Sequence, residues 1–184
     1  MKLAPLVFFL AACIVLLIGC DASTPSQNVA RAEQLVEGGD SAAALALADG
    51  AIEALAKASN DPDALFRAHV LRCRALAESN AEKAFEEWQG LVNDNPKAAD
   101  AAVTESVVRS LRRTREGQGF AVTAAERAKQ RFPDQSATFD AILQDMSNDD
   151  TLSGAARDKL KALGYIGASK KDKKDAKPTP APRQ

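Results

Sequence analysis

The chain has 184 residues, a formal net charge of −1 and 46% hydrophobic residues. The near balance of 24 basic against 25 acidic residues argues against a nucleic-acid-binding protein, which needs a broad basic face. The single histidine excludes a metal site built from several histidines, and we expect no metal or cofactor.

Residues 1–20 have the pattern of an export signal. Lys2 supplies one positive charge, residues 6–18 are apolar, and the run ends in Leu17-Ile18-Gly19-Cys20 before the polar Asp21. The apolar stretch is shorter than the roughly 18 to 20 continuous residues of a comfortable membrane-spanning helix. An ordinary secretory signal and an uncleaved anchor remain alternatives, although both leave Cys20 without a role.

The junction at Gly19 and Cys20 resembles the lipobox of bacterial lipoproteins. This resemblance implies a diacylglycerol thioether on Cys20, cleavage of the Gly19–Cys20 peptide bond, and acylation (palmitate or a similar chain) of the new amino group. Residues 1–19 would then be the signal peptide. Residues 20–27, which are mostly small and polar, would form a lipidated flexible tether. In some Gram-negative lineages an aspartate after the lipidated cysteine marks retention in the inner membrane, so Asp21 favours the inner membrane without deciding the matter.

Beyond the tether the sequence predicts an all-α fold. Alanine is abundant, aromatic residues are few, and alternating runs of β-branched residues are absent. Apolar residues instead recur at helical spacing, in segments separated by turn signals such as residues 38–40. The core positions of these segments, apart from the third, are Val29, Ala32, Leu35 and Val36; Leu45, Ala48, Ile52 and Leu55; Ala84, Phe85, Trp88, Leu91 and Val92; Ala99, Val103, Val107 and Leu111; Ala121, Ala125, Ala128 and Phe132; Phe139, Ile142, Leu143 and Met146; and Leu152, Ala156, Leu160 and Leu163.

The third segment has a different pattern. It opens with Asp61 as the N-cap and Pro62 at the first helical position, where the missing N–H costs nothing. Its apolar residues between 65 and 77 cover too much of the circumference for a helix with one buried side. We therefore expect this helix to lie between other helices.

Glycine, asparagine and proline indicate where the later helices end. Residues 93–96 are expected to end the fourth helix and cap the fifth, and residues 117–119 to end the fifth. Gly164 fits a left-handed C′ position, with Tyr165 as the apolar partner of a Schellman-type cap. Residues 168–184 are rich in lysine and proline and lack periodicity, so the helical domain is predicted over 28–167 and a disordered tail beyond it.

The helices are expected to form pairs that recur. Gly39-Asp40 matches Ser79-Asn80 at a shift of about 40 residues, and Pro96 matches Pro133 at about 37. Across residues 28–133 this pattern resembles degenerate tetratricopeptide repeats, which implies a solenoid of stacked antiparallel helical hairpins. A plain helical bundle is the alternative.

A second resemblance lies in Leu160-Lys161-Ala162-Leu163-Gly164-Tyr165, which is similar to the ending of many bacterial secreted sulfatases and repeat proteins. The sulfatase active-site signature is absent around both Cys20 and Cys73. The segment is therefore interpreted as a helix-capping module that closes a stack.

Basic residues at the end of the fifth helix form a candidate binding site for an anion or an acidic peptide. These candidates are Arg109, Arg112 and Arg113. The alternative is a solvated face, because cations complement the C-terminal end of a helix. Pairing of Arg109 with Glu105, and of Arg112 with Glu116, would support that alternative.

His69 and Cys73, one turn apart, are the only dyad available for nucleophilic catalysis. We expect His69 to be structural and Cys73 to be a buried, unreactive thiol. Once Cys20 is lipidated and the signal has been removed, Cys73 has no cysteine partner for a disulfide. Phe85 and Trp88 are interpreted as core residues, so no catalytic residue is assigned.

The sequence thus predicts a lipid-anchored, non-enzymatic protein of the bacterial cell envelope with its domain facing the periplasm. Its helical repeats would bind a peptide or a partner protein, with the membrane contacted through the lipid. The alternative is an accessory structural subunit of an envelope enzyme or secretion complex, and a catalytic role through His69 and Cys73 comes third.

Overall fold

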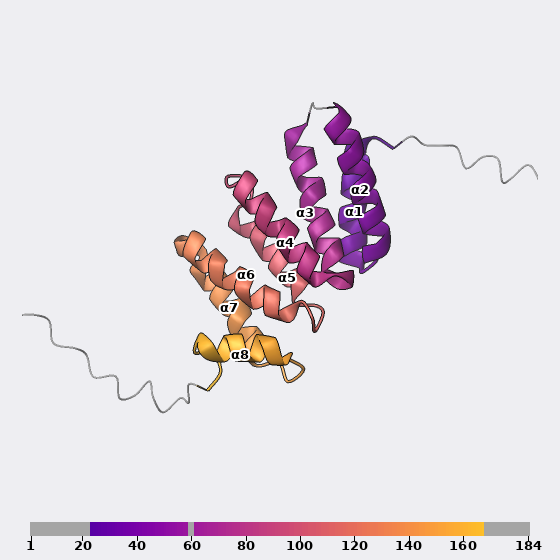
Figure 1. The fold of residues 1–184 in the computed structure, drawn as a ribbon. Coiled ribbons are helices and arrows are strands. Elements are labelled where there is room, and N and C mark those ends of the chain that lie inside the picture. The colour runs from indigo at the N-terminus through magenta and orange to yellow at the C-terminus, as the bar shows by residue number, and fades with distance from the viewer. Residues whose placement is uncertain (1–22, 59–60, 168–184) are drawn as a thin grey trace, which may run out of the picture.

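The computed structural model describes residues 23–58 and 61–167, and within these ranges the regular secondary structure is entirely helical. The predicted all-α class is confirmed. Figure 1 shows the helices following one another in a row from one end of the molecule to the other. They are α1 (Pro25–Gly38), α2 (Ser41–Ala58), α3 (Pro62–Ser79), α4 (Ala81–Asp94), α5 (Ala101–Leu111), α6 (Gln118–Arg131), the 3₁₀ turn η2 (Pro133–Gln135), α7 (Ser136–Ser147) and α8 (Gly154–Ala162).

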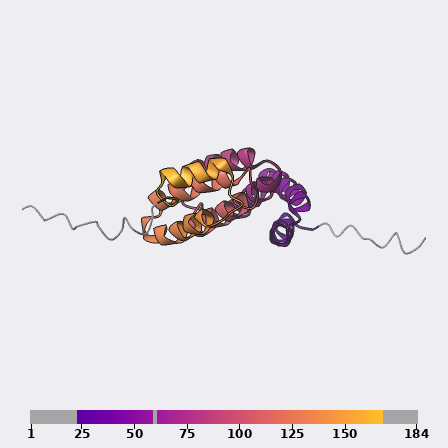
Figure 2. The same ribbon diagram turned by 90° about the horizontal axis from the view of Figure 1, so that it is seen from below.

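The helices stack in the manner of a solenoid. Among the described helices, every extensive contact joins neighbours in sequence, such as α2 with α3, or next-but-one neighbours, such as α1 with α3 and α6 with α8. Figure 2 shows the yellow α8 and the orange α7 on opposite sides of the stack. A bundle would bring its first and last helices to one shared core, whereas in this stack each helix buries its apolar face on near neighbours.

Helix α3 lies between two separate hydrophobic clusters. Ala68, Leu71 and Ala75 belong to the N-terminal cluster with α1 and α2. Val70 and Cys73 belong to the larger cluster that continues through α8. Because α3 is buried on both sides, its sequence carries apolar residues around most of its circumference, as predicted.

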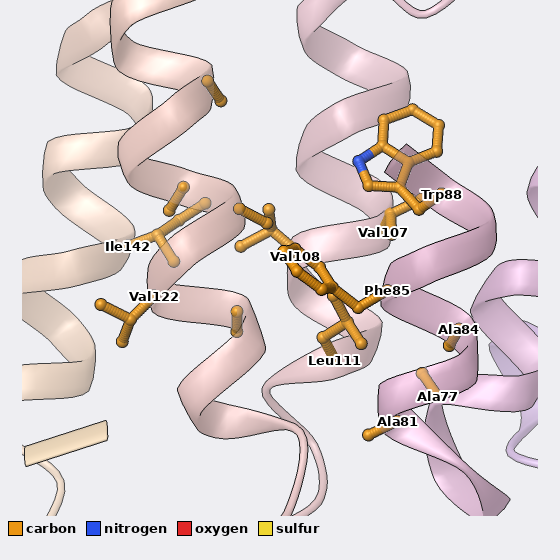
Figure 3. Close-up of a cluster of buried hydrophobic side chains, with 14 of the residues drawn as sticks. Ala77, Ala81, Ala84, Phe85, Trp88, Val107, Val108, Leu111, Val122 and Ile142 are labelled. Atoms are coloured by element: carbon orange, nitrogen blue, oxygen red, sulfur yellow. The ribbon is translucent and has the colours of Figure 1, made fainter. Parts of the chain in front are cut away.

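The larger cluster holds α4, α5, α6 and α7 together. Figure 3 shows Phe85 pointing from α4 toward Val108 and Leu111 of α5, with Val122 and Ile142 on the helices beyond. Leu111 and Val108 are fully buried. These side chains fill the space between the helices, so the positions of α4 and α6 relative to each other are set by packing on α5.

Helix α1 begins earlier than the sequence suggested. Thr24 is its N-cap and forms a capping box with Gln27, in which each side chain accepts a hydrogen bond from the backbone N–H of the other residue. Pro25 occupies the first turn. The domain boundary predicted at residue 28 is therefore three residues too late, and residues 25–27 of the predicted tether are helical.

The N-cap of α3 provides a testable contribution to stability. The Asp61 carboxylate accepts a hydrogen bond from the backbone N–H of Ala64 at 2.8 Å. Asp61→Ala is expected to lower the free energy of unfolding by about 1 kcal/mol, because that N–H loses its partner. Asp61→Ser keeps an acceptor oxygen and should cost only a few tenths of that amount, roughly. Urea denaturation of the three proteins measures both values, and equal losses in the two variants would contradict the capping role.

Two predicted helix boundaries around α5 are wrong. Asp100, not residues 93–96, caps α5, with its carboxylate accepting from the N–H of Val103 at 2.9 Å. Helix α5 ends at Leu111, and Gly117 precedes the first turn of α6 instead of ending α5. Gly119, although a poor helix former, lies inside that turn, where a Cβ would already be 3.5 Å from Ala155 of α8. Glycine therefore allows α6 and α8 to approach closely.

The predicted cap at the end of α8 is confirmed. Gly164 has a φ of 80°, its N–H donates to the carbonyl of Lys161, and the N–H of Tyr165 donates to the carbonyl of Leu160, which together make a Schellman motif. The Tyr165 hydroxyl also donates to Asp140 of α7 and accepts from Lys129 of α6 at 2.8 Å. The segment thus fixes the end of α8 to two neighbouring helices.

Candidate functional site

The residues predicted to carry the lipid anchor lie outside the described part of the chain. Gly19 and Cys20 precede residue 23, and the basic tail follows residue 167. Within the described ranges, no helix is both long and apolar enough to span a bilayer.

The candidate arginines at the end of α5 form ion pairs with three different helices. Arg109 pairs with Glu105 within α5 at 2.7 Å, as predicted. Arg112 pairs with Asp145 of α7 at 2.6 Å and not with Glu116 as predicted. The structure therefore ties Arg112 to a helix 33 residues further along the chain instead of to its own helix.

Arg113 reaches in another direction. It pairs with Glu78 of α3 at 3.5 Å and donates to the carbonyl of Val36 at the end of α1 at 3.3 Å. The structure thus gives Arg109, Arg112 and Arg113 separate partners and does not bring the three guanidinium groups to one shared acceptor. Each cation already has a carboxylate, which weakens the case for an anion site at this position.

His69 and Cys73 line an open cleft of about 460 Å³ between α3 and α4. Cys73 is only 2% exposed, and burial raises the pKa of its thiol to about 12. Burial also lowers the pKa of half-buried His69, and the positive charge of Arg72 lowers it further. Near neutral pH the thiol is protonated and the imidazole is neutral, which agrees with the expected unreactive cysteine.

The polar groups of this cleft are mostly paired with one another. Arg72 donates to Asp49 of α2 at 2.6 Å and to Glu87 of α4, which raises the pKa of its guanidinium. These bonds connect three helices across the cleft. Asp94 also lines it, so the side chains available to a ligand are acidic or apolar.

A second cleft, the α4–α6 cleft, opens between α4, α5 and α6 and has a volume of about 220 Å³. Its apolar lining includes Phe85, Trp88 and Val92 of α4 and Phe132 after α6. Phe85 and Trp88 are core residues, as predicted, since they are 8% and 3% exposed. Each also contributes a surface to this cleft, a role that the sequence did not indicate.

Arg127 and Arg131, one helical turn apart on α6, also line the α4–α6 cleft. The guanidinium of Arg127 lies 5.7 Å from the centroid of the Phe85 ring and donates to the Gln89 side-chain oxygen at 2.6 Å. The guanidinium of Arg131 lies 5.0 Å from the Phe132 ring centroid and donates to the carbonyl of Pro96. Rings and neutral acceptors therefore hold both cations in place.

Neither arginine forms an ion pair with a carboxylate of the residues that the structure describes. This distinguishes them from Arg109, Arg112 and Arg113. Sequence reasoning missed both residues, although their spacing of four and the aromatic Phe132 that follows were visible. What the sequence did not contain was the position of Phe85 and Gln89, about 40 residues earlier, beside them.

Metal chemistry finds no support in the arrangement of side chains, since the described ranges hold no group of three or more histidine, cysteine, aspartate or glutamate residues that could bind an ion. Comparison of the chain with protein-family models, with curated proteins and with solved structures finds no match. The argument for function therefore rests on the residues themselves.

Proposed function

We propose that this protein is a lipoprotein of the bacterial cell envelope, anchored to a membrane through Cys20, whose stacked helices bind a peptide segment or a partner protein. The anchor is supported by Leu17-Ile18-Gly19-Cys20 and its resemblance to a lipobox. The binding role is supported chiefly by the open α4–α6 cleft, where Arg127 and Arg131 lie beside an apolar lining without carboxylate partners. In this proposal the helical domain faces the periplasm, and Asp21 favours the inner membrane.

The chemistry of the clefts favours binding over catalysis. The one dyad of the chain, His69 and Cys73, has a thiol whose pKa is raised to about 12, so the reactive thiolate is scarce at neutral pH. The exposed surfaces of a helical stack instead suit recognition of an extended or helical partner, because each repeat adds surface along one direction. The protein acts in this proposal as a scaffold without an enzymatic activity of its own.

Changing Cys20 to alanine tests the anchor. The variant is expected to move from the membrane fraction to the soluble periplasmic fraction or the unprocessed precursor, because a lipid chain gains about 0.8 kcal/mol for each CH₂ group that it buries. Cell fractionation with immunoblotting measures the distribution, and labelling with a radioactive fatty acid reports the acyl chains directly. The matched control, Cys73→Ala, removes the other cysteine and should remain labelled and membrane-bound.

A Cys20→Ala protein that stays in the membrane fraction after a carbonate wash would contradict the lipoprotein assignment. It would indicate that the apolar residues 6–18 remain in the membrane as an uncleaved anchor. Labelling of Cys73→Ala at the level of the wild type is required for the same conclusion, since it shows that the label reports Cys20.

The binding role is tested by chemical crosslinking of the wild-type protein in intact cells, followed by mass spectrometry. We expect enrichment of an envelope protein relative to a culture that expresses an unrelated lipoprotein with the same lipobox. That control carries the same anchor and so removes neighbours captured only because they share a membrane. Failure to capture any protein above this control would contradict the scaffold role.

A further inference from the structure

We propose that the α4–α6 cleft binds an acidic segment of a partner protein, with a large apolar side chain in the cleft and carboxylates on Arg127 and Arg131. This inference rests on the proposed function, because it names the site and the chemistry of the partner that the scaffold would bind. Three observations carry it: the size and lining of the cleft, the state of the two arginines, and the charge of the competing occupants.

The size of the cleft suits a side chain and not a whole small molecule. Its volume of about 220 Å³ lies below the roughly 300 to 1,000 Å³ of typical small-molecule sites. Trp88, Val92 and Phe132 give it an apolar lining. A partner's leucine or aromatic side chain placed there would lose contact with water on most sides, which is the source of affinity at the centre of an interface.

Arg127 and Arg131 are positioned for a ligand with negative charge. Each guanidinium has five N–H donors in a planar fork, and the contacts with Gln89 and Pro96 each use one nitrogen. Stacking on Phe85 and Phe132 holds the planes in place, so little side-chain freedom is lost when a carboxylate binds. Charge-assisted hydrogen bonds of this kind are about twice as strong as neutral ones.

Charge also decides between the possible occupants. The chain's own tail, residues 168–184, carries five lysines and one arginine against two aspartates, so the arginines of the cleft repel it. The neighbouring cleft between α3 and α4 presents Glu87 and Asp94, while its Arg72 is already paired with two carboxylates. An acidic segment is therefore attracted to the α4–α6 cleft and repelled from the cleft beside it.

Site-specific photocrosslinking in intact cells tests the inference. A benzoylphenylalanine replaces Asn93, which is exposed and lines the cleft, and in a control protein it replaces Gln34, which is exposed on α1. We expect the probe at Asn93 to capture a protein segment with net negative charge within ten residues of the crosslink, and the probe at Gln34 not to capture that segment.

Two charge variants show whether the arginines are responsible. In the Asn93 probe protein, Arg127→Gln with Arg131→Gln should reduce the yield of this crosslink at least about tenfold, the effect of losing one charge-assisted hydrogen bond. The matched control, Arg31→Gln with Arg157→Gln, removes two charges from exposed positions on α1 and α8 and should leave the yield within about twofold, because distant surface charges are screened. Circular dichroism verifies that all variants are folded.

The outcomes separate this inference from the proposed function. A captured segment that is neutral or basic, a crosslink to lipid, or an unchanged yield in the Arg127 and Arg131 variant would overturn the acidic-segment site. So would capture of a partner by general crosslinking without any capture through Asn93, and in that case the scaffold role stands. If neither method captures a protein, both the scaffold role and the cleft assignment fail.

Discussion

Phe139→Ala is expected to lower the free energy of unfolding by roughly 3 to 5 kcal/mol, the range for a buried phenylalanine replaced by alanine. Phe139 is fully buried on α7, and its ring stacks on that of Phe132 with 6.3 Å between centroids. The substitution removes apolar surface from the larger cluster and leaves a cavity between α6 and α7. Urea denaturation followed by circular dichroism measures the loss.

The position of the damage is as informative as its size. Because α7 packs mainly on α6, amide hydrogen exchange should accelerate more in α6 and α7 than in α1 and α2, which belong to the separate N-terminal cluster. The control Thr138→Ala, at an exposed position on the same helix, should change stability by no more than about 0.5 kcal/mol. A loss below about 1 kcal/mol for Phe139→Ala would contradict the packing described for α7.

Gly117→Ala is expected to lower the free energy of unfolding by about 3 kcal/mol, at the upper end of the usual cost of overpacking. A Cβ at this position would lie 2.1 Å from the carbonyl oxygen of Leu111 and 2.9 Å from the hydroxyl of Thr114. The φ of Gly117 is −76°, so the requirement for glycine is steric and does not arise from an unusual backbone angle. The connection between α5 and α6 must move to accommodate the methyl group.

The same substitution at Gly50 provides a control with the opposite sign. Gly50 lies in the interior of α2, is exposed, and has no atom within 4 Å of the position of a Cβ. Gly50→Ala should raise the free energy of unfolding by roughly 0.5 to 1 kcal/mol, because alanine loses less backbone entropy in a helix. Thermal and urea denaturation of both variants measure the two signs. Equal effects at Gly50 and Gly117 would contradict the close approach at Gly117.

Local features of the fold were predictable from the sequence because their causes are local. The cap at Asp61 depends on an oxygen three residues before the N–H that it binds, and the Schellman motif at Gly164 on a glycine between α8 and Tyr165. Errors occurred where the signals competed. Gly117 and Gly119 looked like the end of α5, but they begin α6, since one must pass close to Leu111 and the other close to α8.

The candidate site could not be predicted in the same way. Arg112 had a carboxylate one turn away in sequence, yet it pairs with Asp145 because α7 lies closer to its guanidinium in the stack. Arg127 looked like one more charge on a solvated helix, and only the packing of α6 beside α4 places it over Phe85. Such contacts join residues more than 30 positions apart, and no local spacing encodes them.

The sequence by itself determined the all-α class, most of the helices, and the position of α3 between two packed faces. It did so because helical period, capping and burial on two sides act within one or two turns of the chain. The tertiary structure decided that the helices stack with near neighbours, which arginines are neutralised, and that an open cleft remains at Arg127 and Arg131. Those outcomes depend on how side chains from separate helices fill shared space, and close packing makes that a property of the whole stack.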